Sequence, residues 1–309
     1  MTASSIQLLL PPLRYWPKPL PDRIARALGR ADRTDTFNDS IIDLPASAAL
    51  SRLGEDDLDI DSVRAYRWLR ADPAWIRPDI TGARLYAVGA MLPLSADDAA
   101  SFSPALQGLL DDAGYQLDIV TPHRWYLRMP VDAVLPNFAT PVTALGEDPF
   151  EHRPEGEGAR EWRGLDNEVQ ITLHQHPRNA ERLSAGLPPI NAIWWWGDAA
   201  LPDKSSSQIP SIYSDDPLLR GWAKAANLHS NPAPERWSMN VDGLYDLRAV
   251  PRDALFDRWL EPALDDVEKG TAMQWICEEG PCFLLTARQR WRFWRSPVEF
   301  SVGASESEE

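Results

Sequence analysis

The class of fold is decided by one stretch of the chain, Leu173-His-Gln-His-Pro-Arg-Asn-Ala-Glu-Arg182 followed by Gly186-Leu-Pro-Pro-Ile-Asn-Ala-Ile-Trp-Trp-Trp-Gly197. Helical spacing leads into it, Pro177 suits the first turn of a second helix, and Gly186 suits the end of that helix. Asn191–Trp196 is a hydrophobic run closed by a glycine, which is typical of a buried strand. The stretch therefore predicts helix, helix and strand in this order.

The same alternation continues on both sides of this stretch. Near the N-terminus, Ile6–Leu10 is an apolar run closed by prolines, which predicts a buried strand. Downstream, the pattern predicts two helices and three strands: Pro217–Ala226, Tyr245–Val250, Asp253–Glu268, Met273–Cys277 and Phe283–Thr286. Alternating strands and helices indicate an α/β protein with a parallel sheet and helices on its faces.

Residues 63–130 follow a different pattern. Val63–Leu69 and Arg84–Leu92 resemble a hairpin, and Ser95 is a suitable N-cap for the helix that follows. Two more strands come next, Leu117–Val120 and Arg124–Met129. The order strand, strand, helix, strand, strand predicts an α+β unit with a mostly antiparallel sheet.

These patterns predict a chain in four parts. An N-terminal part of the α/β core covers residues 1–60, and an inserted α+β domain with a long loop covers 61–160. The remainder of the core follows over 161–300, and a disordered acidic tail covers 301–309.

Composition excludes several classes of function. The net charge of −15, from 31 basic and 46 acidic residues, argues against binding to nucleic acid, because phosphates require a dense basic surface. No stretch approaches the ~20 apolar residues of a membrane span, and the first residues lack the basic start of a signal peptide. The two cysteines, Cys277 and Cys282, do not describe a disulfide scaffold. We therefore expect a cytoplasmic protein that binds neither membrane nor nucleic acid.

The residues themselves point to no catalytic or metal site. The chain has no Gly-x-Ser-x-Gly elbow, no glycine-rich phosphate loop and no dinucleotide fingerprint. His174 and His176 would point to nearly opposite faces of a helix, so they cannot share a metal as an i, i+4 pair could. Asp215-Asp216 fits an acidic helix start and Asp265-Asp266 a solvated helix face. We expect no cofactor.

Arginine and tryptophan offer the remaining candidates. Arginines on or near the 63–130 unit, above all Arg67 and Arg124, could converge on an anionic ligand. The fourteen tryptophans could anchor a core or line a ligand groove. Arg288–Arg295 interleaves arginine with tryptophan and phenylalanine, which could stack on bases, but the alternation favours an amphipathic edge strand.

The stretch from Leu173 to Gly197 is similar to a segment of the archaeal-type cofactor-independent phosphoglycerate mutases. In that family a helix carrying His-Pro-x-Asn-x-x-Arg, a glycine, and a Pro-x-Asn-x-hydrophobic strand ending in Gly occur in this order. The resemblance makes Asn179 and Arg182 candidate ligand-binding residues. Asn and Arg at helix caps and junctions also commonly satisfy backbone groups, so a structural role remains open.

The chain as a whole more closely resembles the RpfE-type regulatory proteins of bacteria, which are often labelled phosphoglycerate mutases. The residues that carry this resemblance are Ala71-Asp-Pro73, Arg124-Trp-Tyr126, Asn167-Glu-Val-Gln170, His176-Pro177, Asn191-Ala-Ile-Trp-Trp-Trp-Gly197 and Trp291-Arg-Phe-Trp-Arg295. This resemblance names relatives and supplies no reaction.

Relatedness to the mutases implies an alkaline-phosphatase-like core, in which the first strand delivers an Asp to two metal ions and late strands supply Asp and His ligands. Here Ile6–Pro12 contains no acid, and Arg288 and Gln289 stand roughly where an Asp-His pair is expected. The Asp-Arg-x-Ala-Gly-Arg substrate motif is also missing, with Ala87-Val-Gly-Ala90 in its neighbourhood. Two-metal phosphoryl transfer without these ligands lacks an activated nucleophile and charge neutralisation. We therefore expect a degenerate core without catalytic or metal-binding residues.

The sequence thus predicts a non-catalytic regulatory or ligand-sensing protein derived from a mutase-like ancestor. Its ligand-binding residues would be Arg67, Arg124, Asn179 and Arg182. The partner would be a small anionic ligand or another protein. Two alternatives stay open: an active phosphomutase or phosphatase with unrecognised ligands, and a protein interaction module that uses tryptophan-rich surfaces.

Overall fold

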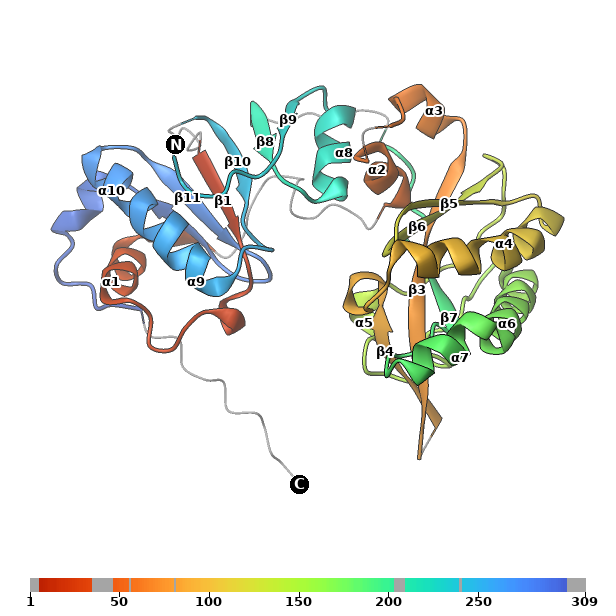
Figure 1. The fold of residues 1–309 in the computed structure, drawn as a ribbon. Coiled ribbons are helices and arrows are strands. Elements are labelled where there is room, and N and C mark those ends of the chain that lie inside the picture. The colour runs from red at the N-terminus through yellow and green to blue at the C-terminus, as the bar shows by residue number, and fades with distance from the viewer. Residues whose placement is uncertain are drawn as a thin grey trace. The chain divides into compact units, whose positions relative to one another are not determined.

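The computed structural model describes residues 6–34, 47–55, 57–80, 82–202, 209–238 and 241–298 (Figure 1). The chain divides into two units. The terminal unit contains the described residues up to 34 and from 209 onward, and the central unit contains the described residues from 47 to 202. The tail predicted over 301–309 lies outside the described residues.

A mostly parallel sheet forms the centre of the terminal unit. Among the described residues its strands run in the order β2-β12-β11-β1-β10-β8-β9. Their bounds are Ile6–Leu10 for β1, Asp32–Thr34 for β2, Ser211–Tyr213 for β8, His229–Asn231 for β9, Gly243–Asp246 for β10, Met273–Cys277 for β11 and Cys282–Leu285 for β12. Strand β1 lies parallel to both β10 and β11 and is buried along its whole length, which confirms the predicted buried strand.

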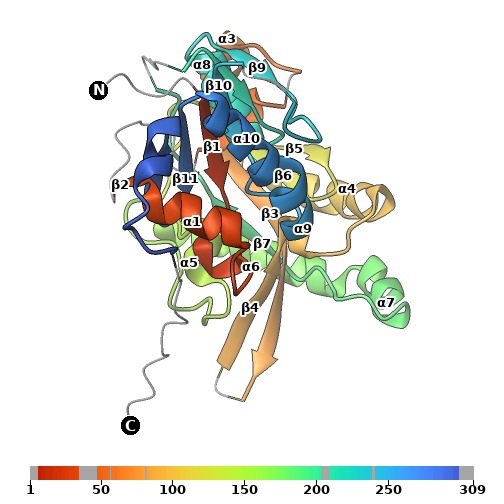
Figure 2. The same cartoon turned by 90° about the vertical axis from the view of Figure 1, so that its left-hand side faces the viewer.

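Helices cover this sheet (Figure 2). They are α1 (Asp22–Arg30), α8 (Pro217–Ala225), α9 (Arg252–Leu255) and α10 (Glu261–Lys269), with a π-helical turn, Phe256–Leu260, between the last two and short 3-10 helices at Leu13–Tyr15 and Ala287–Trp291. Leu8 and Trp275 of the sheet pack with Ile24 of α1 and Leu264 of α10 in one buried cluster. The helix predicted over Asp253–Glu268 is therefore confirmed, with a π-helical interruption.

The prediction of an edge strand over Arg288–Arg295 is wrong. A 3-10 helix, Ala287–Trp291, stands at its start. The Gln289 amide accepts a hydrogen bond from the backbone N–H of Thr286 (3.0 Å) and donates one to the carbonyl of Leu284 (2.9 Å). These bonds turn the chain directly after β12, which lies between β11 and β2 and is therefore not an edge strand.

The central unit contains an antiparallel sheet. Its strands are β3 (Arg67–Asp79), β4 (Gly82–Val88), β5 (Gln116–Thr121), β6 (Arg124–Met129) and β7 (Ala192–Trp196). They run in the order β4-β3-β6-β5, and β7 pairs with β3. The predicted order of strand, strand, helix, strand, strand is confirmed. The first strand begins later than predicted because residues 60–64 form a short helix, which Asp59 caps through the backbone N–H of Ser62 (2.7 Å).

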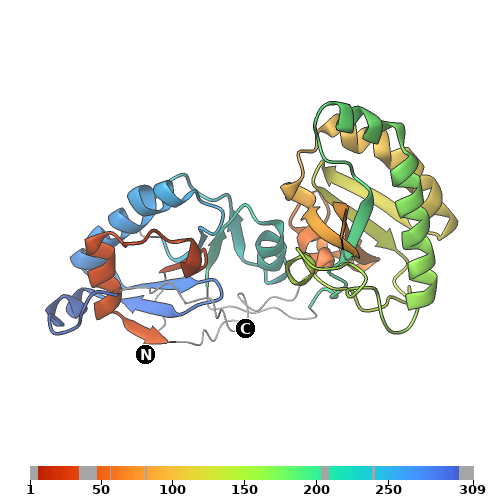
Figure 3. The same cartoon turned by 90° about the horizontal axis from the view of Figure 1, so that it is seen from below.

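Helices pack on this sheet (Figure 3). They are α2 (Ala48–Leu53), α3 (Ile60–Arg64), α4 (Ala96–Asp112), α5 (Pro141–Ala144), α6 (Ala159–Gln175) and α7 (Pro177–Ser184), with a 3-10 helix at Gly89–Met91. Helix α4 begins at the predicted N-cap, Ser95, which forms a capping box with Asp98. Phe102 of α4 and Val169 of α6 pack with Trp195 of β7. In the part of the chain that the structure describes, no helix is long and apolar enough to cross a membrane.

The division of the chain differs from the boundary expected at residue 160. Helices α6 and α7 and strand β7 belong to the central unit, although the sequence assigned them to the α/β core. Strand β7 pairs with β3, with Trp195 opposite Ala71. Trp195 and Trp194 are buried in two different hydrophobic clusters of this unit, so both sides of β7 are covered there. The alternation of helices and strands did not specify which sheet this strand would join.

Candidate ligand-binding site

The two arginines predicted to clamp an anion do not converge. Arg67 is paired with Met129, at one end of β6, whereas Arg124 lies at the other end of that strand. Because side chains alternate along a strand, Arg124 also points to the face opposite that of Met129. Arg67 donates to the carbonyl of Ala133 (2.8 Å), and Arg124 forms an ion pair with the buried Glu55 (2.7 Å). Both guanidinium groups therefore contact partners within the chain.

Asn179 connects three backbone groups inside the central unit. Its side-chain amide donates to the carbonyls of Leu173 (2.7 Å) and Ile190 (2.8 Å) and accepts from the N–H of Ile190 (2.8 Å). The side chain thereby joins the end of α6 to the segment that enters β7. Both N–H donors of this amide and its oxygen therefore bond to the backbone of the chain.

Arg182 is buried and paired. Its guanidinium forms an ion pair with Asp98 at 2.7 Å and donates to the carbonyl of Pro93 at 3.2 Å. Burial raises the pKa of Asp98, but hydrogen bonds from Ser95 and Arg178 outweigh it and hold that pKa below its usual value. The carboxylate thus stays charged opposite the guanidinium, and the pair joins α7 to the start of α4.

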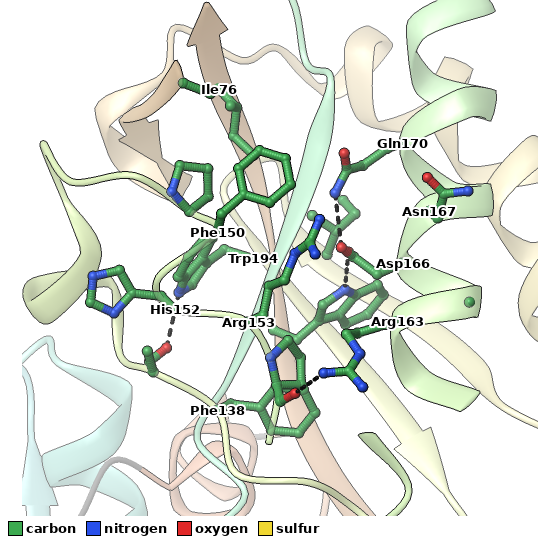
Figure 4. Close-up of a pocket in the computed structure, with 17 residues that line it drawn as sticks. Ile76, Phe138, Phe150, His152, Arg153, Arg163, Asp166, Asn167, Gln170 and Trp194 are labelled. Carbon is green, nitrogen blue, oxygen red and sulfur yellow. Dashed lines mark hydrogen bonds between the residues drawn. The ribbon is translucent and has the colours of Figure 1, made fainter. Parts of the chain in front are cut away.

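A cavity of about 620 Å³ lies elsewhere in the central unit, between α6, β7 and the loop before α6 (Figure 4). Volumes of this size are usual for sites that bind small molecules. The walls are mostly apolar and aromatic, and its polar groups come from α6 and the loop. Its lining comprises Ile76, Ala83, Phe138, Ala139, Pro149, Phe150, His152, Arg153, Pro154, Arg163, Gly164, Asp166, Asn167, Gln170, Ile193, Trp194 and Trp195.

Helix α6 supplies a carboxylate to this cavity. Asp166 accepts hydrogen bonds from the indole N–H of Trp195 and from the amide of Gln170, both at 2.8 Å. Burial raises the pKa of Asp166, and these two bonds together with the charge of Arg153 oppose that shift. Since each oxygen already has a donor, Asp166 is held in place as a fixed part of the wall.

Two guanidinium groups face the same cavity (Figure 4). Arg153 lies over the ring of Phe150, 4.1 Å from its centroid, and Arg163 donates to the carbonyl of Pro154 at 3.4 Å. Within the described ranges neither forms an ion pair, whereas the neighbouring His152 is bonded to Glu147 at 2.5 Å. Most of their N–H donors are therefore free to bind an anion.

The terminal unit contains a second polar cluster, at the carboxyl edge of its parallel strands. Arg248 follows β10 and donates to Asp246 (2.8 Å), to Asp216 after β8 (2.7 Å) and to Glu278 after β11 (3.4 Å). In open α/β sheets ligands commonly bind outside this edge. Here a guanidinium occupies it, surrounded by three carboxylates.

These residues do not fit the two-metal centre that the resemblance to phosphoglycerate mutases implies. Strand β1, which ends at this edge, supplies only Ile6-Gln-Leu-Leu-Leu10 and no ligand. The carboxylates of Asp216, Asp246 and Glu278 are bonded to a cationic side chain of the protein itself. Across the described residues, no three His, Cys, Asp or Glu side chains are grouped so that they could hold a metal ion.

None of the ligand-binding residues predicted from the sequence lines this cavity. Arg153 stands in a proline-rich stretch that predicts only an irregular loop, and Arg163, Asp166 and Gln170 have the spacing of one helix face. That spacing, beside a run of three tryptophans, was the available signal. Trp194 and Trp195 line the cavity, as the sequence suggested for some of the tryptophans.

Comparison with known proteins gives local matches to phosphoglycerate mutases. No family model matches the chain. Over 93 residues it is 41% identical to a probable 2,3-bisphosphoglycerate-independent phosphoglycerate mutase of Geobacter sulfurreducens, covering 28% of this chain and 23% of that protein. Over 73 residues it is 33% identical to the corresponding enzyme of Methanothrix thermoacetophila, covering 24% and 18%. The matches thus span about a fifth of these relatives' length, and they point to the cofactor-independent phosphoglycerate mutase family.

Two solved structures are similar along most of the chain. The cofactor-independent phosphoglycerate mutase of Thermoplasma acidophilum has a TM-score of 0.41 and 14% identity over 96% of this chain and 93% of its own. A protein from Pyrococcus horikoshii has a TM-score of 0.43 and 11% identity over 92% and 88%.

Proposed function

We propose that this protein is a non-catalytic regulatory protein of the RpfE type, derived from a cofactor-independent phosphoglycerate mutase, that binds a small anionic ligand in the cavity beside α6. In this proposal the terminal unit is a degenerate alkaline-phosphatase-like core. The central unit is then an insertion, since it enters the chain between β2 and β8. Two free, buried cysteines, Cys277 and Cys282, suit a reducing cytoplasm.

Arg248 is the observation that carries the non-catalytic part of the proposal. Phosphoryl transfer by this family's chemistry needs metal ions to activate a nucleophile and neutralise the developing charge. At the carboxyl edge of the sheet, Asp246 is 8% exposed in its side chain and is held by the Arg248 guanidinium at 2.8 Å. A fixed guanidinium offers positive charge, but it cannot bind and activate a water or a hydroxyl group as a metal does.

The cavity carries the ligand-binding part. Arg153 and Arg163, which form no ion pair among the described residues, lie beside its apolar walls, and such a combination of a few polar groups with an apolar body is typical of small-molecule sites. In this proposal Arg153 and Arg163 take the ligand-binding role that the sequence predicted for four other residues. The polar groups of those four, Arg67, Arg124, Asn179 and Arg182, are bonded within the chain.

A protein interaction module is the second candidate, and one observation favours it. Trp291, Phe293 and Trp294 are 65%, 78% and 70% exposed. Large aromatic side chains exposed side by side are common at protein interfaces. Co-purification of one partner in stoichiometric amount, lost when these three residues become serine, would support this reading.

The test of the non-catalytic proposal is a turnover assay. We expect no conversion of 3-phosphoglycerate and no hydrolysis of p-nitrophenyl phosphate with manganese or zinc added, because the edge of the sheet holds Arg248 where activating metals would be needed. An authentic mutase serves as the positive control. Metal-dependent turnover that disappears in Asp246→Asn contradicts the proposal, whereas turnover unchanged in that variant comes from a contaminating enzyme.

A further inference from the structure

The apolar part of the cavity is suited to a flat molecule. Phe138, Phe150 and Trp194 contribute three aromatic rings to its walls, and Ile193 of β7 adds an aliphatic side chain. Aromatic rings prefer offset-stacked or edge-to-face partners at 4.5–7 Å, so a planar ring system gains more here than a flexible chain of equal area. The Trp194 indole donates to the carbonyl of Ala139 at 3.0 Å, which fixes this ring in the wall.

The two guanidinium groups of the cavity indicate the charge of its ligand. Arg153 and Arg163 bring two guanidinium groups that form no ion pair among the described residues, and the His152 ring is bonded to Glu147. The two Asp166 oxygens accept N–H donors from Trp195 and Gln170, and burial raises the pKa of this carboxyl. The cavity therefore favours an anion. A carboxylate in the plane of a ring fits between the flat aromatic walls and the two guanidinium groups, whereas a tetrahedral phosphate group does not lie flat against these walls.

The geometry of Arg153 connects the two halves of the cavity. Its guanidinium stacks on the ring of Phe150 at 4.1 Å, so the edge of this cation borders the aromatic surface. Planar N–H pairs of arginine match the two oxygens of a carboxylate. A ring packed against the aromatic wall would thus place an attached carboxylate near Arg153, which Figure 4 shows between Phe150 and Asp166.

We infer that the cavity binds a planar aromatic monocarboxylate, with its ring against Phe138, Phe150 and Trp194 and its carboxylate at Arg153 and Arg163. The inference rests on the proposed function, since it takes this cavity as the ligand site. It excludes phosphate esters, including the substrates of mutases, as the natural occupants of this cavity.

Isothermal titration with four probes tests the class of ligand. The probes are 2-naphthoate, 2-naphthylmethanol with the same rings and no charge, octanoate with the same charge and no ring, and inorganic phosphate. We expect one 2-naphthoate per chain, with the alcohol and octanoate each bound about tenfold more weakly or worse, because charge-assisted hydrogen bonds and ring stacking are each lost. Phosphate should not displace 2-naphthoate.

Variants locate the binding. The double change Arg153→Ala with Arg163→Ala should weaken 2-naphthoate at least about tenfold, and Phe150→Ala should weaken it as well. Phe150 is 57% exposed, so its loss should leave the fold intact. Arg160→Ala is the matched control, because Arg160 is an exposed arginine of α6 that does not line the cavity.

Four other outcomes would each contradict a different part of the inference. Equal binding of the alcohol shows an apolar pocket without selection for an anion, and equal binding of octanoate removes the planar requirement. Displacement by phosphate identifies a phosphate site, in which case the proposed sensor survives with a different ligand. Absence of 2-naphthoate binding, or binding unchanged in the double variant, rejects this ligand class for this cavity. The turnover assay tests the proposed non-catalytic function independently of these binding experiments.

Discussion

Replacing Asp98 with alanine is expected to lower the free energy of unfolding by about 3–5 kcal/mol, because the buried Arg182 guanidinium loses its counter-ion. The Arg182 side chain is 1% exposed and lies 2.7 Å from the Asp98 carboxylate, which is 4% exposed. The same carboxylate accepts hydrogen bonds from the N–H of Ser95 (2.9 Å) and from Arg178 (2.8 Å), so the start of α4 is weakened too. Urea unfolding followed by circular dichroism measures the change.

Asp97→Ala is the matched control, since Asp97 is an exposed acid in the same helical turn and should change stability by about 0.5 kcal/mol or less. The pKa of Asp98 is lowered on folding, despite the burial that raises it, by bonds from Ser95 and Arg178. Its contribution is therefore present above the unfolded pKa of about 3.9 and is lost as the pH falls through the folded value. The gap between the wild-type protein and Asp98→Ala should narrow below about pH 4. A gap of equal size at pH 3 and pH 7 contradicts this account.

Replacing Asn179 with alanine should cost about 3 kcal/mol or more. Its side chain is 5% exposed and satisfies the carbonyl of Leu173 and both backbone groups of Ile190. Each buried backbone group left without a partner costs about 1–3 kcal/mol. The same urea unfolding experiment measures the loss.

Asn137→Ala provides the comparison, because Asn137 is an exposed asparagine of the same unit and its loss should be nearly neutral. This pair of variants distinguishes a structural role of Asn179 from a ligand-binding role. If Asn179→Ala left stability unchanged and instead weakened binding of a phosphorylated ligand, the residue would be a ligand contact and the structural account of the motif would be wrong.

Local patterns predicted most elements of the fold. The apolar run of β1, the Ser95 cap and the Pro177 helix start are all short-range signals, and the structure contains each of them. Long-range partners were not visible in these patterns. Strand β7 has the hydrophobic pattern of any buried strand, and pairing with β3 depends on contacts between residues more than a hundred positions apart.

The candidate site was harder to predict for the same reason. An arginine on a strand can clamp a ligand or pair within the chain, and the choice for Arg124 depends on Glu55, far away in sequence. Arg248 lies between carboxylates from three separate segments, and the cavity arises where α6, β7 and a loop meet. Only the tertiary structure brings these groups together. The sequence patterns indicated only that arginine side chains were available to bind an anion, and not which of them would share a site.

The most direct test of the central claim is a titration of the metal-free protein with manganese, followed by electron paramagnetic resonance of the free ion. The account predicts no stoichiometric binding at micromolar manganese, because the carboxylates at the edge of the parallel sheet are bonded to Arg248 and β1 offers no ligand. Binding of two ions per chain at this concentration would contradict the account and restore a metal-dependent enzyme as the function of this protein.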